Sequence, residues 1–212
     1  MSNEINYNQY IDEVLSGKIV VCKLVKAAVA RHINDLKKSE SKDSDFYFDE
    51  KAAERAIKFI QLLKHSEAEW AGQNIKLEGW QQFICASLFG WKKRSTGKRR
   101  FRKAYIEVAR KNGKTTFAAA IGLYMFIADG EEGAQCFTAA CKREQAKISH
   151  TLATRMIKKS SLKKIITVFK DNLTYPKINA KYVPLGQDSK TEDGLNPHFV
   201  LIDEYHAHPS DE

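Results

Sequence analysis

Residues 112–116, with the sequence Asn-Gly-Lys-Thr-Thr, constrain this chain more than any other stretch. Residues 104–109 before them alternate apolar and polar side chains as a β-strand does, and residues 116–128 after them favour a helix. A phosphate-binding loop needs a glycine that lets the backbone approach the ligand, N–H groups at a helix N-terminus, a lysine, and a hydroxyl that can bind Mg²⁺. All four are present, so we predict a strand, a phosphate-binding loop and a helix.

An apolar run that ends in two acids supports this interpretation. Residues 197–202 read as an apolar strand, and Asp203 and Glu204 follow it directly. In a Walker B pair of this kind, the first acid supports Mg²⁺ and the second positions the attacking water. The usual phosphate-loop pattern, G-x-x-x-x-G-K-[ST], has a glycine where this chain has Val108, so the loop match alone is partial. The acid pair favours a nucleotide site over a turn with a solvated lysine.

The charge of the chain indicates a polyanionic partner. Its formal net charge is +9 and its pI is about 9.3, which favours nucleic acid as the class of partner. Residues 92–103 hold eight basic side chains and no acid. Such a block either contacts a phosphate backbone or is a solvated loop, and both alternatives stay open.

Cysteine spacing and hydropathy are typical of a cytosolic protein without a membrane helix. The four cysteines show no C-x-x-C spacing, and we interpret them as reduced core thiols of a cytosolic protein. No apolar run approaches the length of a membrane helix, and the N-terminus has no signal-peptide pattern.

Between these motifs the chain alternates helices and strands. Amphipathic helices are expected over residues 7–35, with a break at Ser16 and Gly17, and over residues 50–65, with Asp49 as N-cap. Further strands are expected at residues 134–140, 173–175 and 178–185, a helix at residues 143–158, and a polar loop at residues 186–194. This alternation predicts an α/β fold with a mainly parallel sheet and a ligand at the carboxyl ends of its strands.

Six motifs follow one another along almost the entire chain: LEGWQQFI at 77–84, LFGW at 88–91, ARKNGKT at 109–115, AACKREQA at 139–146, DGLN at 193–196 and LIDEYH at 201–206. Together they resemble the ATPase half of tailed-bacteriophage terminase large subunits. The resemblance implies a RecA-like P-loop core, residues 76–212, after a helical N-terminal segment, residues 1–75. It also implies a motor that hydrolyses Mg·ATP to move double-stranded DNA into an empty capsid, joined in its complete form to a C-terminal nuclease.

The motif and the resemblance together give the expected roles of the loop residues. Lys114 bridges the β- and γ-phosphates of ATP, and the hydroxyl of Thr115 binds Mg²⁺. Arg110 lies where the family carries a basic residue, and it is the candidate γ-phosphate sensor. The remaining cofactor-binding residues contact the phosphates through the loop: Lys111, Asn112, Gly113 and Thr116.

Four residues outside the loop have expected roles. Asp203 supports the metal ion, and Glu204 orients the water that attacks ATP. Gln81 lies where the family recognises adenine, although from the residues alone a surface glutamine beside a core tryptophan would be preferred. Arg143 is either a candidate to reach the nucleotide or DNA of a neighbouring subunit or a solvated helix residue.

Partners and location are implied by the same resemblance. The partners are double-stranded DNA, the portal protein, the small terminase subunit and further copies of the chain. The location is the host bacterial cytoplasm, with transient docking on the procapsid and no membrane. The chain ends eight residues after Glu204, before the coupling motif and the nuclease acids of the family. We therefore expect ATP binding of about −4 to −8 kcal/mol, feeble ATPase activity and no DNA cleavage.

Other functions remain open at this point. A helicase-type ATPase would carry a similar loop and acid pair. A nucleic-acid-binding module with a vestigial nucleotide site would not require Glu204. A zinc site built from Asp203, Glu204, His206 and His208 is disfavoured, because zinc prefers a closed tetrahedral set of His and Cys ligands.

Overall fold

The computed structural model describes residues 4–185 and 194–207, so most of the polar loop predicted at residues 186–194 lies outside the described part. Its contacts separate two compact units. The first comprises residues 1–61 and 76–107, and the second comprises residues 62–75 and 108–212. The boundaries of these two units differ from the predicted domain boundary after residue 75, which stays a prediction.

The first unit consists mainly of helices. Its elements are α1 (Tyr7–Leu15), α2 (Lys23–Ser39), β1 (Phe46–Phe48), α3 (Glu50–Leu62, of which residue 62 belongs to the second unit), α4 (Gly79–Gly90) and β2 (Trp91–Lys93). The predicted break between the first two helices is confirmed, and Gly17 there has a φ of 78°. Asp49 caps α3 as predicted, because its carboxylate accepts the N–H of Ala52 at 3.0 Å. β1 and β2 pair antiparallel.

A buried histidine lies in the core of the first unit. His32 is 3% exposed, and its Nδ1 accepts a hydrogen bond from the indole N–H of Trp91 at 3.1 Å. The ring of Phe48 meets the imidazole edge-on, with the centroids 5.2 Å apart. Burial lowers the pKa of His32 to about 4, although the neighbouring carboxylate of Asp35 opposes this shift.

We expect this unit to lose stability on acidification. An unfolded histidine takes up a proton below its usual pKa of 6.5, whereas folded His32 stays neutral down to about pH 4. The contribution of neutral His32 to the free energy of unfolding is therefore fully present above pH 6.5, and about 3 kcal/mol of it is lost as the pH falls towards 4. Urea unfolding at pH 7 and pH 4 measures this loss. The control is His32→Gln, which keeps an acceptor for Trp91 but cannot titrate, and an equal pH dependence in both proteins would contradict the expectation.

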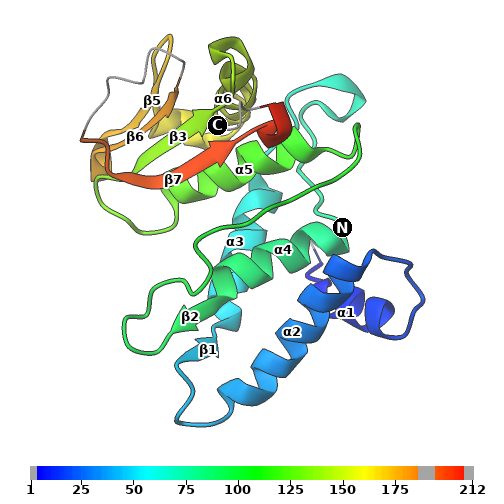
Figure 1. Ribbon diagram of the computed structural model, residues 1–212. Helices are drawn as coiled ribbons and strands as arrows, with labels where there is room; N and C mark the ends of the chain where they lie inside the picture. Colours follow the sequence, from blue (N-terminus) through cyan, green and yellow to red (C-terminus); the bar gives the residue numbers. More distant parts are fainter. Residues whose placement is uncertain (1–3, 186–193, 208–212) are drawn as a thin grey trace. The chain divides into compact units, whose positions relative to one another are not determined.

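The second unit contains the main sheet. Its elements are η1 (Ala68–Trp70), α5 (Lys114–Ile127), β3 (Gln135–Ala139), α6 (Arg143–Lys158), η2 (Ser161–Lys164), β4 (Thr167–Val168), β5 (Leu173–Tyr175), η3 (Pro176–Ile178), β6 (Ala180–Pro184), β7 (Pro197–Ile202) and η5 (Tyr205–Ala207). The strand order is β4-β5-β6-β3-β7, and Figure 1 shows β3 between β6 and β7. β3 is parallel to both of these neighbours, whereas β4 and β5 continue the sheet antiparallel.

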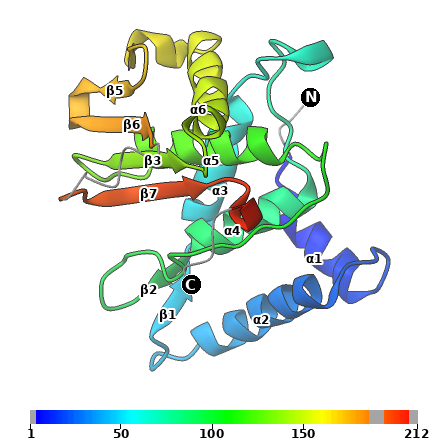
Figure 2. The same ribbon diagram turned by 45° about the horizontal axis from the view of Figure 1, so that its top comes forward.

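Both long helices of the second unit pack on one face of the sheet (Figure 2). The fully buried ring of Tyr182 on β6 meets Phe126 of α5 and His150 of α6, at centroid distances of 5.9 and 5.5 Å. α5 passes close to the sheet at Gly122, where an added Cβ would lie 2.5 Å from the hydroxyl of Tyr182. A side chain at this position would therefore require the buried ring of Tyr182 or the helix itself to shift.

The strand predicted before the phosphate loop is absent. Residues 104–109 form no strand in the structure, and Tyr105 is 73% exposed. A strand needs a neighbouring strand that completes its hydrogen-bond ladder. Among the described residues, the edge strand β7 pairs with β3 alone, so residues 104–109 do not pair with its other side. Alternation of polar and apolar residues without such a neighbour did not produce a strand. The helix after the loop is confirmed, but it begins at Lys114, two residues earlier than predicted.

Cysteine burial corrects a further prediction. All four cysteines are free, and Cys85 and Cys136 are buried, but Cys22 is exposed and is not a core thiol. No helix in the described part of the chain is both long and apolar enough to cross a membrane.

Candidate nucleotide site

The loop before α5 turns through two left-handed residues, Lys111 with a φ of 67° and Gly113 with a φ of 69°. A Cβ at position 113 would meet no atom within 4 Å, so the backbone conformation is what favours glycine there. The side-chain amide of Asn112 donates to the carbonyls of Ala109 at 3.1 Å and Arg110 at 3.3 Å. These two bonds hold the loop in shape just before the helix.

The N-terminus of α5 follows this loop directly. The N–H of Phe117 donates to the carbonyl of Gly113 at 2.9 Å. The N–H groups of the three residues between them have no carbonyl acceptor within the helix, as in the first turn of any α-helix. These residues are Lys114, Thr115 and Thr116. Such a turn stabilises an anion, since N–H groups and the helix dipole both point positive charge towards it.

The acid pair lies at the carboxyl end of β7. The N–H of Asp203 donates to the carbonyl of Ala139 at 3.0 Å, which ties the end of β7 to the end of β3. Oδ1 of Asp203 accepts the N–H of Glu204 at 3.0 Å. Glu204 has a φ of 50°, a conformation that is uncommon outside glycine and that occurs often at functional sites.

An ion pair brings the loop and the acid pair together. The ammonium of Lys114 lies 2.8 Å from Oε1 of Glu204 and 3.6 Å from Oδ1 of Asp203. The hydrogen bond to Glu204, with help from the charge of Asp203, raises the pKa of Lys114. The side chains of Lys114 and Glu204 are each 33% exposed, so solvent and solutes can reach them. Sequence analysis placed both residues at one nucleotide site but missed their direct contact, because no local pattern reports a side-chain pair 90 positions apart.

The oxygen ligands at this place fit Mg²⁺. Thr115 offers a hydroxyl beside Lys114, and Asp203 offers a carboxylate that is 16% exposed. Mg²⁺ usually takes one or two protein oxygens and fills its remaining positions with water and substrate phosphates. Within the described residues, no group of three or more His, Cys, Asp or Glu side chains is placed to hold a metal ion, and His208 lies outside them.

Three other predicted site residues lie outside the ion-paired cluster of Lys114, Asp203 and Glu204. Arg110 is exposed on the loop, and Arg143 is exposed as the first residue of α6. Gln81 belongs to the first unit, where its side chain accepts the N–H of Glu78 at 3.0 Å and completes a capping box for α4. The E-x-x-Q spacing before an apolar run carried this signal, and sequence analysis missed it. The adenine role of Gln81 stays a prediction.

The basic segment, residues 92–103, divides into structural and exposed cations. The guanidinium of Arg100 lies 2.7 Å from the carboxylate of Asp35 and 3.5 Å from the ring centroid of Phe46. Lys98 and Arg102 are exposed. Arg100 therefore stabilises the first unit, and only part of the segment is available to contact a phosphate backbone.

Comparison with known proteins identifies the family. Residues 79–212, more than half of the chain, match the family described as terminase large subunit, ATPase domain. The terminase large subunit of Enterobacteria phage HK97 is 30% identical over 156 residues, which cover 71% of this chain and 30% of that protein. The crystal structure of the HK97 bacteriophage large terminase matches with a TM-score of 0.60 and 26% identity, over 71% of this chain and 30% of the solved chain.

These matches confirm the predicted α/β, RecA-like fold class. The chain spans about 30% of the length of these relatives. Membership of an ATPase-domain family also supports the use of a nucleotide and an ATP-hydrolysing activity. The chain belongs to the family of terminase large-subunit ATPase domains.

Proposed function

We propose that this chain is the motor portion of a phage DNA-packaging terminase, in which residues 76–212 hydrolyse Mg·ATP to drive double-stranded DNA into the procapsid. The observation that carries the proposal is the meeting of Lys114 with Asp203 and Glu204 beside the N-terminus of α5. A cation next to helix N–H groups suits phosphate, and a carboxylate beside that cation suits the positioning of water.

The proposed reaction begins with an exchange of partners at Lys114. Its ammonium leaves Glu204 for the β- and γ-phosphate oxygens, while the first N–H groups of α5 hold the β-phosphate. Glu204 is then free to orient the water that attacks the γ-phosphorus, and Arg110 adds positive charge to the γ-phosphate. Thr115 and Asp203 would hold Mg²⁺, which when bound compensates charge on the phosphate oxygens.

DNA is the proposed polyanionic partner, and the net charge of +9 supports it. The portal protein, the small terminase subunit and further copies of the chain are the other proposed partners. The proposed location is the host bacterial cytoplasm, with transient docking on the procapsid.

Phosphate release from Mg·ATP tests the proposal when it is measured with and without linear duplex DNA. We expect slow release that duplex DNA stimulates. Separation of the strands of a forked duplex would favour a helicase-type ATPase instead. DNA binding without any phosphate release would favour a nucleic-acid-binding module with a vestigial nucleotide site.

A further inference from the structure

The sheet of the second unit has a face that α5 and α6 do not cover, and a polar row crosses it. Thr167, Thr174, Lys181 and Gln135 lie directly opposite one another on β4, β5, β6 and β3. Side chains alternate between the faces of a strand, and the neighbouring Tyr182 points to the helices, so this row points away from them. Lys181 is exposed.

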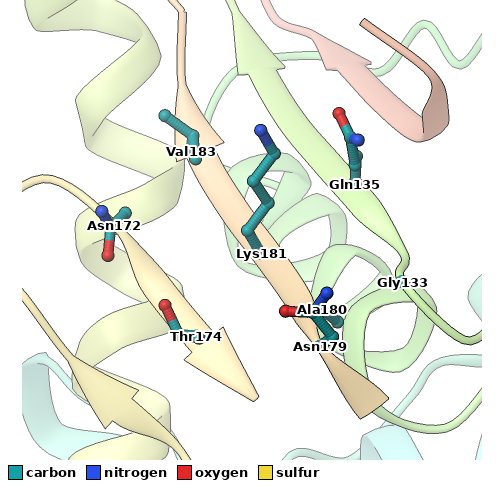
Figure 3. Close-up of a pocket in the computed structure, with 8 residues that line it drawn as sticks. All are labelled: Gly133, Gln135, Asn172, Thr174, Asn179, Ala180, Lys181 and Val183. Carbon is teal, nitrogen blue, oxygen red and sulfur yellow. The ribbon is translucent and has the colours of Figure 1, made fainter. Parts of the chain in front are cut away.

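A cavity of about 400 Å³ is lined by three members of this row, Thr174, Lys181 and Gln135. Figure 3 shows Lys181 in its middle, with Thr174 and Asn172 on one side, Gln135 on the other, and Asn179 at one end. Every polar side chain among these can donate a hydrogen bond, and none of the described residues that line the cavity carries a carboxylate. A single cation surrounded by amide and hydroxyl donors suits the oxygens of an anion.

Lys181 is available for such an anion. Within the described residues its ammonium forms no ion pair, and it lies 5.9 Å from the ring centroid of Phe137. Glu131 and Glu132 precede Gly133, which lies at one end of the cavity. Because their carboxylates repel a polyanion, the opposite end of the cavity, where Asn172 lies, is the favoured place for one.

That opposite end carries an exposed aromatic ring and more cations. The N–H of Phe169 donates to the carbonyl of Asn172 at 2.9 Å, which closes a two-residue turn between β4 and β5. Register then places Phe169 opposite Asn172, on the same face as the cavity, and Phe169 is 55% exposed. The turn itself contains Lys170 and Asp171, and the carboxylate of Asp171 is compensated by Lys147 at 3.2 Å.

The chain leading into this edge is strongly basic. Residues 155–170 contain six basic side chains and no acid. Arg155 pairs with Glu67, whereas Lys163 and Lys164 are exposed at the end of η2, four and three residues before the start of β4. This edge therefore presents closely spaced positive charge next to an exposed ring, a combination that suits a sugar–phosphate chain.

We propose that this sheet face and its β4–β5 edge bind the phosphodiester backbone of DNA. Lys181 contacts a phosphate in the cavity, Lys163, Lys164 and Lys170 contact neighbouring phosphates along the edge, and Phe169 packs against a sugar or a base. The inference rests on the proposed function, because DNA is the partner proposed there. It assigns the contact to a surface other than the basic segment at residues 92–103.

The test compares two double variants of the full chain by fluorescence anisotropy, with a labelled duplex and a labelled single strand. Lys170→Gln/Lys181→Gln removes two of the proposed phosphate-binding cations, and Lys51→Gln/Lys177→Gln removes the same charge at exposed lysines elsewhere. We expect the slope of log K against log salt to become less negative only in the first variant. The expected change in slope is about 0.9 for each duplex phosphate that is no longer neutralised, and about 0.7 for each phosphate of a single strand. The form of DNA whose affinity falls further in the first variant is the form that this surface binds.

Lysine acetylation of the unmodified protein provides a second readout that needs no variant. DNA should slow the labelling of Lys163, Lys164, Lys170 and Lys181, and leave Lys51 and Lys177 unchanged. Equal salt slopes in both variants, or equal labelling with and without DNA, would overturn this inference and leave the proposed function standing. Failure of the unmodified protein to bind either DNA at low salt would overturn the DNA partner of the proposed function together with it. Unchanged ATP binding in both double variants shows that the nucleotide site is intact.

Discussion

Lys114→Ala is expected to abolish measurable binding of Mg·ATP. The ammonium is the cation that lies beside the N-terminus of α5, and a hydrogen bond to a charged group contributes about 1.5–3 kcal/mol. Its loss therefore raises Kd at least about tenfold. It also leaves Asp203 and Glu204 uncompensated, so their charge repels the phosphates. Titration calorimetry with Mg·ATP measures the effect, starting from a Kd in the micromolar-to-millimolar range, about −4 to −8 kcal/mol.

The matched control is Lys177→Ala, which removes an exposed lysine from the same unit. It should bind Mg·ATP as the unmodified protein does. Because Lys114 is one-third exposed, its replacement should leave the fold intact, and circular dichroism checks this point. Unchanged ATP affinity in folded Lys114→Ala would contradict the assigned role.

Glu204→Gln is expected to stop hydrolysis while it preserves or strengthens ATP binding. The amide cannot orient the attacking water as a carboxylate does, so turnover should fall at least about a hundredfold. The amide also holds the ammonium of Lys114 less firmly. An ion pair at a partly exposed site contributes up to about 1 kcal/mol, so ATP affinity should rise by no more than about fivefold.

Calorimetry and phosphate release on the same sample separate the two effects. Glu144→Gln is the control, since Glu144 is an exposed acid in the first turn of α6. Loss of ATP binding in Glu204→Gln, equal to the loss in Lys114→Ala, would show that Glu204 serves the binding of the nucleotide and not the cleavage step.

Local patterns predicted the elements that form the candidate site. The apolar run before Asp203 predicted β7, and the helix-forming run at residues 116–128 predicted most of α5, because both patterns depend on neighbouring residues. The helix at residues 143–158 was predicted with its observed bounds. Such elements have enough apolar residues at one period to fix their type.

The features that sequence analysis missed depend on distant partners. The pairing of Lys114 with Glu204 spans 90 positions, and the strand predicted at residues 104–109 lacks a neighbour. The ladder between β4 and β5 involves only two residues of β4, too few to show an alternating pattern. Arg100 belongs to the basic run that was expected either to contact a phosphate backbone or to be solvated, but it pairs with Asp35, which lies 65 positions away.

A single-turnover experiment tests whether Lys114, Asp203 and Glu204 form an ATP-hydrolysing site. The protein is mixed in excess with Mg²⁺ and radiolabelled ATP, quenched at intervals, and the bound nucleotide is separated into ATP and ADP. We expect the unmodified chain to convert bound ATP slowly to ADP and phosphate, while Glu204→Gln retains intact ATP. Bound ATP that stays intact in the unmodified chain, or cleavage at equal rates in both proteins, would contradict the claim that Lys114, Asp203 and Glu204 form an ATP-hydrolysing site.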